Sequence, residues 1–555
     1  MQRRRFLQLA GISAAGFIYT RFDPVTGSPF DSMRMPDSVS VRCAGNWIPL
    51  KKSGDTWKMQ RIQVELKEKG RALSLQIEAP HQELEMIQCS WKQPAFAASS
   101  KYLGDHWERS YGDLSWEGPS SSRKSPWYIL ISDGLQTHAF GVKTGANSIC
   151  YWQAAPGSLD LLLDTHSGGM GVQLGERALH VADIITTKNL YGENPYHTDI
   201  RFCKMMCDQP MLPKKPVYGI NDWYFAYGNN SRDLILEHTR LMADLVTDTS
   251  NTPYSVVDMG WSVKPVKSNE EYCWGDDFTR GNASFGDMNI VASDIKKLGM
   301  LPGLWYRPLQ ASARDNPASL IPIRPDQKDL KERFFDPTIP ENLLRMHDNI
   351  TLYQQWGYDM VKHDFTSFDL FGRWGFEMNE EITVAGWHFQ DRSVTNAEII
   401  LKLYRTLRHA ATNMYLIGCN TFSHLSAGLF ELNRIGDDTS GNEWARTLKM
   451  GVNTLGFRLP QHNTFYAADG DCVGLTTKVP WAKNKQWLQL LAESSAPLFI
   501  SAQPEALGTE QKESIKIAFA QAAKVQPLGE PLDWMSNPRP ATWKLNDRTV
   551  HFDWA

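Results

Sequence analysis

The sequence of 555 residues lacks several features that would define its class at once. It has eight cysteines but no C-x-x-C pair, so it carries neither a zinc-ribbon nor a thioredoxin motif. Its net charge is −4, from 58 basic and 62 acidic side chains, so the basic excess of a nucleic-acid-binding protein is missing. A mean hydropathy of −0.40 excludes a polytopic membrane protein. Neither a G-x-G-x-x-G after a strand nor a G-x-x-x-x-G-K is present, which removes the main nucleotide-binding signatures.

Aromatic side chains, by contrast, are abundant. Trp occurs 20 times, about once in 28 positions. Trp-rich proteins often stack indole rings on the apolar faces of sugars, and large β-rich cores also use Trp, so the composition leaves both interpretations open. A hydrophobic content of 42% and a charged content of 22% indicate ordinary globular structure. The length predicts two or three domains.

The first 35 residues have the pattern of an export signal. Arg3 and Arg4 are followed, after one residue, by Phe6 and Leu7, and the apolar stretch over 9–19 is too short to span a membrane. We therefore expect export by the twin-arginine route to the periplasm or the extracellular space. The alternative is a basic N-terminal helix on a cytoplasmic protein. Because the twin-arginine route carries folded proteins, we expect reduced thiols and no disulfide.

The rest of the chain divides into three predicted domains, in a multidomain α/β and β protein. Residues 36–212 contain short alternating strands, such as 61–66 and 73–77, with no convincing helix of 12 or more residues, which predicts a β-sandwich. Residues 213–505 alternate short apolar runs with amphipathic helices, and this length suits a (β/α)8 TIM barrel. Residues 506–555 hold one helix and then short strands, which predicts a small C-terminal β-rich cap.

Polar residues collect at the predicted C-terminal ends of the barrel strands and in the loops after them, where a TIM barrel carries its chemistry. They include no histidine cluster of the kind that binds a metal, so we expect neither a metal nor a cofactor. Paired carboxylates between aromatic walls suit glycoside hydrolysis, in which one carboxylate attacks the anomeric carbon and the other protonates the leaving oxygen. These residues are Asp258, Trp261, Trp305, Arg307, Lys362, Asp364, Asn420, Arg434, Asp437, Asp438 and Asp471.

One predicted strand carries the clearest signal. Lys362 lies two residues before Asp364, so both side chains point to the same face of the strand. The lysine charge favours the ionised form of a neighbouring carboxyl group, as a nucleophile requires. Any single Asp at a strand end is also explained as a solvated residue or a helix cap. It is the set of them together that indicates a site.

Several of these segments resemble the α-galactosidase clan, glycoside hydrolase families 27 and 36. The run Asp359-Met-Val-Lys362-His-Asp364 is similar to the clan's Lys-x-Asp nucleophile strand, and Asp258-Met-Gly-Trp261 resembles its Asp-Asp-Gly-Trp. Arg434-Ile-Gly-Asp-Asp438 resembles the Arg-x-x-x-Asp segment of the shorter family 36 enzymes. The similarity covers about residues 215–505. It implies a retaining exo-glycosidase that hydrolyses terminal α-galactoside-like sugars through a covalent glycosyl-enzyme, and the N-terminal segment predicts that this enzyme is exported.

The resemblance also implies roles for single residues. Asp364 becomes the nucleophile, and Asp438, four residues after Arg434, becomes the acid/base, with the adjacent Asp437 as the alternative. The implied partner is an oligosaccharide or polysaccharide side chain, without nucleic acid or membrane insertion, and the oligomeric state is left undefined. The residues that would bind sugar in subsite −1 are Asp258, Lys362, Arg434, Cys419 and Asp471, with Trp223 and Trp305 as its walls.

One position departs from the clan. Met259 stands where the clan has the second Asp of Asp-Asp-Gly-Trp, a pair that in α-galactosidases holds the galactose 4- and 6-hydroxyls. A thioether removes at least one charge-assisted hydrogen bond. A β-L-arabinopyranoside, which lacks C6, or a galactose modified at C6 is therefore an alternative substrate. A non-catalytic carbohydrate-binding barrel and a transglycosylase on the same scaffold are alternative functions.

Overall fold

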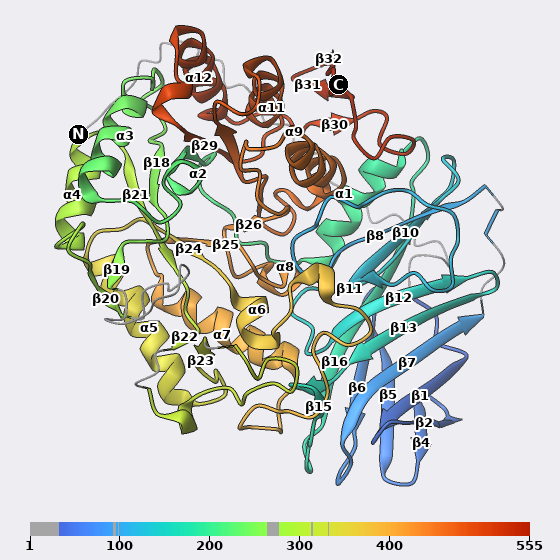
Figure 1. Cartoon of the computed structure of the whole chain (residues 1–555). Helices are drawn as coiled ribbons and strands as arrows, with labels where there is room; N and C mark the ends of the chain where they lie inside the picture. Colours follow the sequence, from blue (N-terminus) through green and yellow to red (C-terminus); the bar gives the residue numbers. More distant parts are fainter. Residues whose placement is uncertain (1–32, 93–95, 98, 264–276, 312–314, 331) are drawn as a thin grey trace, which may run out of the picture.

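A computed structural model of the chain describes residues 33–92, 96–97, 99–263, 277–311, 315–330 and 332–555. The predicted export signal lies outside these residues except for its last three positions. Figure 1 shows a β-rich region, coloured blue to cyan, beside a larger α/β region that runs from green to red. None of the seven cysteines in the described ranges forms a disulfide.

Residues 38–188 build two antiparallel sheets. In β5 (Ile62–Lys69) and β6 (Ala72–Glu78), side chains alternate between buried and partly exposed, as expected of strands with one face in a core. Buried side chains from both sheets join one apolar cluster. The first sheet has the order β2 (Asn46–Pro49), β1 (Ser38–Cys43), β7 (Leu84–Lys92), β13 (Ser158–Asp164), β12 (Ile149–Ala155), β9 (Ser125–Pro126). The second has the order β3 (Lys51–Ser53), β4 (Thr56–Met59), β5, β6, β16 (Leu179–Lys188), β11 (Thr137–Val142), β10 (Tyr128–Ser132), β8 (Lys101–Gly104).

Helix α1 (Pro195–Met206) follows these sheets and packs against β11 and β16. The expectation of no 12-residue helix before residue 212 is therefore wrong. The start signal was present, because the Asn194 side chain accepts a hydrogen bond from the His197 N–H and Pro195 occupies the first turn. The buried face also contains Thr198 and Asp199, and these polar residues obscure the helical period in the sequence.

The larger region is a closed parallel barrel. Strands β27 and β28 are consecutive in the chain, separated only by Gly470 and Asp471, yet β27 pairs with β26 and β28 pairs with β29. We count β27 and β28 as the two halves of a single seventh strand. Because this strand pairs with β26 on one side and with β29 on the other, eight strands close into a ring, as predicted. The strands are β17 (Tyr218–Asn221), β18 (Tyr254–Val257), β21 (Leu301–Tyr306), β24 (Met360–His363), β25 (Tyr415–Gly418), β26 (Leu432–Arg434), β27 (Ala467–Asp469), β28 (Cys472–Leu475) and β29 (Leu498–Ala502).

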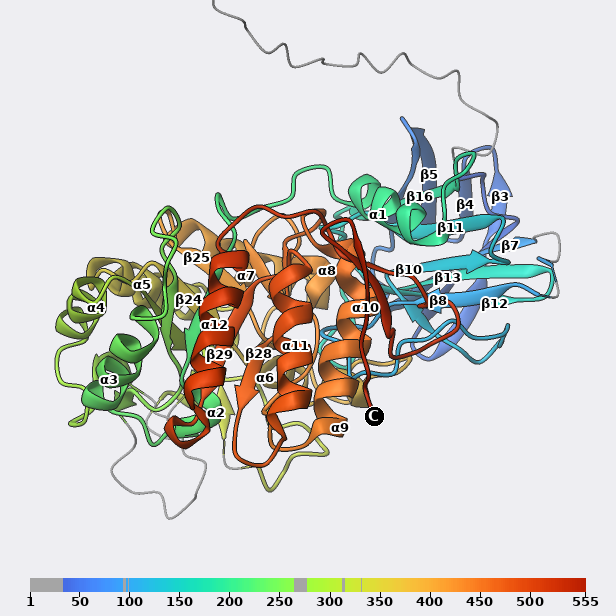
Figure 2. The same cartoon turned by 90° about the horizontal axis from the view of Figure 1, so that it is seen from above.

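Helices cover the outside of this barrel. The last of them, α12, lies beside α11 (Figure 2) and packs Phe519 against Tyr218 of β17 with ring centroids 5.4 Å apart. The barrel therefore extends past residue 505, the predicted boundary, because its eighth strand still needs a helix to cover it. The helices are α3 (Arg232–Ala243), α4 (Met288–Lys297), α5 (Pro340–Gln355), α7 (Asn396–Ala410), α10 (Thr454–Arg458), α11 (Trp481–Glu493) and α12 (Thr509–Ala522).

A three-stranded sheet ends the chain, formed by β30 (Glu530–Pro531), β31 (Thr542–Leu545) and β32 (Arg548–His551). The last two strands are those predicted for the C-terminal cap. Across the described ranges, no helix combines the length and the apolar character needed to cross a bilayer.

In the N-terminal β-rich region, the segment that directly follows β8 contacts the barrel. Ser110 donates from its N–H to the Ile435 carbonyl at 2.7 Å and accepts from the Asp437 N–H at 3.1 Å. Nearby, Asp105 forms a fully buried ion pair with Arg458, with 2.9 Å between Oδ1 and Nε. These contacts hold residues 105–111 against the loop that follows β26.

Replacing Asp105 by Asn removes the charge that neutralises Arg458 while keeping the side-chain shape. A buried cation left without its partner costs about 3–5 kcal/mol, so we expect the free energy of unfolding to fall by that amount in urea titrations followed by Trp fluorescence. Glu510→Ala serves as the control, because it breaks an exposed pair with Lys485 and should leave the free energy of unfolding nearly unchanged. Equal stabilities of D105N and the unmodified protein would contradict the role given to this pair.

Candidate active site

The predicted site residues do converge at the carboxyl ends of the barrel strands. Asp258 follows β18, and Lys362 and Asp364 belong to β24 and the residue after it. Arg434 ends β26, and Asp471 lies in the break of the seventh strand, where its φ of 70° turns the backbone out of the strand. The break thus places a carboxylate where a regular strand would continue its backbone hydrogen bonds to the neighbouring strands.

Lys362 and Asp258 form a largely buried ion pair of the site. Lys362 Nζ lies 2.6 Å from Asp258 Oδ2, and this oxygen also accepts from Asn221 Nδ2 at 2.7 Å. Burial alone would lower the pKa of Lys362, but the Asp258 charge outweighs it and holds that pKa well above its ordinary value. Asp222, beneath Asp258, has a raised pKa because it is buried and faces the Asp258 charge. The lysine is therefore a fixed cation beside Asp364.

Asp364 is held by neutral donors. Its Oδ2 accepts from Trp305 Nε1 at 3.0 Å, and its Oδ1 accepts from the Phe365 N–H at 2.8 Å. With its amide nitrogen turned toward this carboxylate, Asn420 donates to the same Oδ1 at 2.6 Å. Phe365 adopts a left-handed φ of 65°, which turns its N–H back onto the preceding side chain. Three donors fix the carboxylate, and no cation of the described ranges forms an ion pair with it.

The two predicted tryptophan walls differ. Trp305 is only 1% exposed, so it offers no open face for stacking on a sugar, and it acts instead through its N–H on Asp364. Trp223, in the short helix α2 (Trp223–Ala226), is partly exposed and meets Tyr227 edge to face at 5.3 Å. Tyr227 is itself 44% exposed, so these two rings have surface available to a ligand.

Arg434 links three predicted site residues. Its guanidinium lies 3.0 Å from Asp471 Oδ1, 3.2 Å from Asp438 Oδ1 and 3.4 Å from Cys419 Sγ. The second oxygen of Asp471 accepts from the Thr439 N–H at 2.7 Å and from the Tyr224 hydroxyl. Arg434 is 1% exposed, so this cation depends on its two carboxylates for charge compensation.

Arg109 is a site residue that the sequence did not reveal. It comes from the N-terminal β-rich region, yet its Nη2 lies 2.6 Å from Asp437 Oδ1 and its Nη1 lies 3.9 Å from Asp438 Oδ1. Nη1 also lies 3.8 Å from Cys419 Sγ, and the side chain is 7% exposed in all. Nothing in the sequence could have signalled this contact, because more than 300 residues separate Arg109 from Asp437.

The two adjacent aspartates have different surroundings. Both oxygens of Asp437 bind arginines, Oδ1 with Arg109 and Oδ2 with Arg446 Nη2 at 2.6 Å. The Asp438 side chain is 35% exposed, and among the residues that the structure describes only its Oδ1 contacts a cation. Burial raises the pKa of Asp438, but the charges of Arg434, Arg109 and Lys362 outweigh it and hold the pKa below its ordinary value. Asp438 therefore has a free oxygen for a ligand, and Asp437 does not.

Met259 lies directly beside this cluster. Its N–H donates to Asp258 Oδ1 at 2.8 Å, its carbonyl accepts from Asn230 Nδ2 at 3.2 Å, and its side chain, 4% exposed, belongs to the main apolar cluster. A pocket inside the barrel is lined by Lys362, Arg434, Asp469 and Asp471 together with apolar side chains. Burial raises the pKa of Asp469 to about 6. In the described part of the chain, no group of three or more His, Cys, Asp or Glu side chains could hold a metal ion.

A closed (β/α)8 barrel with carboxylates and cations at its carboxyl end is an architecture typical of glycoside hydrolases. No protein-family model matches the sequence, and no curated protein matches it. Solved structures do match. The α-galactosidase from Thermus thermophilus, in complex with p-nitrophenyl α-D-galactopyranoside, aligns with a TM-score of 0.58 and 16% identity over 93% of this chain and 99% of that one.

Two further structures are similar. A family 36 α-galactosidase variant from Geobacillus stearothermophilus, in complex with 1-deoxygalactonojirimycin, aligns with a TM-score of 0.61 and 13% identity over 94% of this chain and 80% of that one. The galactosidase domain of an α-galactosidase–sucrose kinase aligns with a TM-score of 0.55 and 14% identity over 89% and 70%. The chain therefore has the fold of the family 36 α-galactosidases, as its motifs predict.

Proposed function

We propose that this protein is a retaining exo-glycosidase that hydrolyses terminal α-galactoside-like sugars, with Asp364 as nucleophile and Asp438 as acid/base. The observation that carries the proposal is the presence of two differently held carboxylates at the barrel end. Asp364 is fixed by three neutral donors beside Lys362, whereas Asp438 has an unbound oxygen and a partly exposed side chain. Retaining glycosidases need one carboxylate that acts as the nucleophile and a second that exchanges a proton with the substrate.

The reaction follows from these positions. Asp364 attacks the anomeric carbon while the bond to the leaving oxygen breaks, and Asp438 gives that oxygen its proton. Water then attacks the anomeric carbon of the glycosyl-enzyme, Asp438 takes a proton from the water, and Asp364 leaves as a carboxylate. Lys362, Asp258, Arg434 and Asp471 would bind the sugar hydroxyls, since together they present fixed donors and acceptors at the barrel end.

The substrate class rests on the similar structures and on Met259. The Thermus enzyme was solved with an α-galactopyranoside and with stachyose, and the Geobacillus enzyme with raffinose, which favours an oligosaccharide with a terminal α-galactosyl unit. Met259 favours the second candidate, a β-L-arabinopyranosidase, because it puts an apolar side chain next to Asp258 where the clan has a second carboxylate. The twin-arginine pattern of residues 3–7 supports export, so the substrate would be met outside the cytoplasm.

We expect Asp364→Ala to lower kcat/KM for a p-nitrophenyl glycoside by at least about 1,000-fold, because no second carboxylate on β24 could replace the nucleophile. Added azide should restore turnover and give a glycosyl azide of inverted configuration, identified by NMR. Asp359→Ala is the matched control, since Asp359 stands at the other end of the same strand and pairs with Lys296 on the surface. Near-normal activity of D364A would overturn the assignment.

If Asp438 is the acid, replacing Arg109 should change the pH dependence of kcat/KM. The cations lower the pKa of Asp438, so its protonated form, needed for the first step, is lost as pH rises. Removing one cation in Arg109→Gln raises that pKa, and the alkaline limb of kcat/KM should move to higher pH. Arg345→Gln is the control, because Arg345 pairs with Asp315 away from the site and should leave the limb in place. An unmoved limb in R109Q would argue against Asp438 as the acid.

A comparison of two substrates distinguishes the candidates. If Met259 faces the sugar near C6, the protein should prefer p-nitrophenyl β-L-arabinopyranoside to the α-galactoside, and Met259→Asp should shift kcat/KM toward the galactoside. One charged hydrogen bond is worth about 1.5–3 kcal/mol, or about 10–150-fold. If Met259 packs in the core instead, M259D loses stability and the ratio stays the same. A preference of the unmodified protein for the galactoside would exclude the second candidate and leave the first.

A further inference from the structure

Glu108 is a fully buried carboxylate of the N-terminal β-rich region that the proposed reaction does not use. No cation of the described ranges forms an ion pair with it. Its oxygens accept hydrogen bonds from the Tyr111 hydroxyl, the Ser367 hydroxyl and the Gly375 N–H, the last at 3.0 Å. A buried carboxylate is costly without such donors. Two of the three donors belong to the barrel and follow the nucleophile strand, in α6 (Thr366–Phe371) and just beyond it.

Glu108 acts on the nucleophile through the start of α6. This helix begins directly after Phe365, whose left-handed φ turns its N–H onto Asp364. Within the helix, Ser367 gives its hydroxyl to Glu108 and its N–H to the Asn420 carbonyl at 3.2 Å. The backbone that carries the Phe365 donor is therefore tied to the N-terminal region two residues further on.

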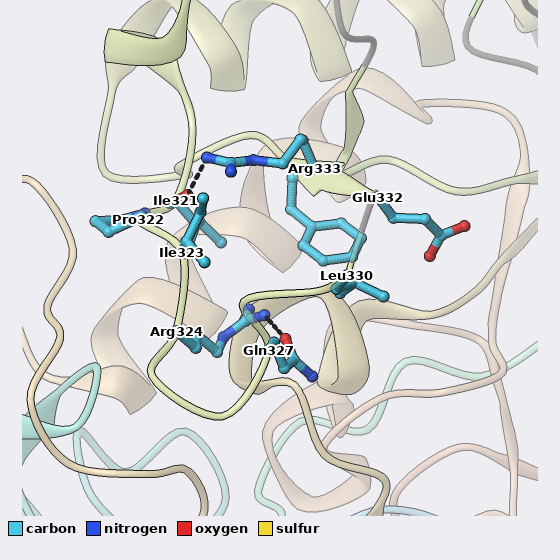
Figure 3. A pocket seen from close by; sticks show the side chains of 9 residues that line it. Ile321, Pro322, Ile323, Arg324, Gln327, Leu330, Glu332 and Arg333 are labelled. Atoms are coloured by element: carbon cyan, nitrogen blue, oxygen red, sulfur yellow. Dashed lines mark hydrogen bonds between the residues drawn. The ribbon is translucent and has the colours of Figure 1, made fainter.

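The opposite end of α6 is held by the barrel itself. There the loop between β21 and α5 supplies two donors: Arg324 donates to the Asp369 carbonyl, and Gln327 donates to the Gly372 carbonyl at 2.8 Å. Figure 3 shows Arg324 and Gln327, which are joined by a hydrogen bond of 2.7 Å. The barrel thus anchors the end of this helix, and Glu108 anchors its beginning, where the backbone leaves the nucleophile.

The next residue, Arg109, acts on a second donor to the nucleophile. Its Nη2 donates to the side-chain oxygen of Asn420 at 3.1 Å, and the amide nitrogen of Asn420 then donates to Asp364 Oδ1 at 2.6 Å. A guanidinium has donors and no acceptor, so it binds only the oxygen of an amide. Arg109 thereby selects which end of the Asn420 amide faces the nucleophile.

We propose that Glu108 and Arg109 are positioning residues, which orient two of the three donors that hold Asp364. This inference rests on the proposed role of Asp364 as the nucleophile. The third donor, Trp305 Nε1, belongs to β21 of the barrel. Glu108 fixes the backbone on one side of the carboxylate, and Arg109 fixes the Asn420 amide on the other. The N-terminal region would then be part of the catalytic machinery.

Two titratable groups face Asp364, and neither changes its charge where a carboxyl group titrates. Burial and the Asp364 charge raise the pKa of the Cys419 thiol, so this group stays neutral. For Lys362, on the same strand as Asp364, burial is outweighed by the Asp258 charge, so its pKa stays high and it remains a cation. The acidic limb of kcat/KM therefore reports the ionisation of the nucleophile and the donors that favour it.

A double-mutant cycle on the acidic limb tests the role of Arg109. Asn420→Ala removes one donor from Asp364, so the ionised nucleophile forms less readily and the limb should move up by about 1 pH unit. Arg109→Gln should move the limb in the same direction. In the N420A background this second shift should nearly vanish, because Arg109 has no amide left to orient. Asn349→Ala, which loses a buried amide donor to the Tyr306 hydroxyl, is the matched control and should leave the limb in place.

Glu108→Gln tests the other half of the proposal. Because the Phe365 N–H loses its support, we expect kcat/KM to fall about 10-fold and the acidic limb to move to higher pH. Glu431→Gln is the control: Glu431 is also buried, pairs with Arg408 and precedes β26 at the opposite end of the barrel, so its loss should leave the limb unmoved. If E108Q does not fold, the cycle of Arg109 and Asn420 still decides.

An acidic limb that stays in place in N420A, or a shift in R109Q that is equal with and without Asn420, would overturn the inference. Titration of the Asp364 carboxyl group by NMR, with carbon-13-labelled aspartate and Asp364→Asn for assignment, makes the same comparison without turnover. An unmodified protein that hydrolyses no glycoside would thus refute the proposed function, while the NMR shifts in N420A and R109Q would still decide this inference.

Discussion

Charge compensation away from water is the constraint on which the barrel end depends. Lys362, Arg434 and Arg109 are largely or fully buried there, and each would be costly alone. Each lies against carboxylates that come from other strands or loops: Asp258 for the lysine, and Asp471, Asp437 and Asp438 for the arginines. The folded barrel is needed to bring these pairs together, so its closure and the assembly of the site are one event.

The break in the seventh strand shows how the backbone serves this arrangement. A regular strand would direct the residue after Asp469 along the barrel wall. The left-handed φ of Asp471 instead turns its carboxylate toward Arg434, and the Thr439 N–H and the Tyr224 hydroxyl hold it there. The strand resumes at Cys472 to pair with β29, so the ring closes despite the interruption.

The sequence could predict the barrel and most of its polar ring because those features are local. A strand that ends in Asp or Lys, or a helix such as 288–297, is recognised from the spacing of residues that are close in the sequence. Arg109 and α12 depend on packing between distant segments, and no spacing encodes it. Trp305 was expected as a sugar-stacking wall because its type suggests it, but burial converts it into a hydrogen-bond donor to Asp364.

The two proposed catalytic carboxylates differ in their hydrogen-bond and ion-pair partners. This difference explains how one could act as the nucleophile and the other as the acid/base. Asp364 is bound by an indole, a backbone N–H and an amide, which keep its position while leaving its charge available for attack. Asp438 is bound by guanidinium groups, whose charges lower its pKa and favour its ionised form. A sugar that takes hydrogen bonds from Arg434 would weaken this hold and raise the affinity of Asp438 for a proton. Substrate binding would then itself prepare the acid, whereas the nucleophile would need no change.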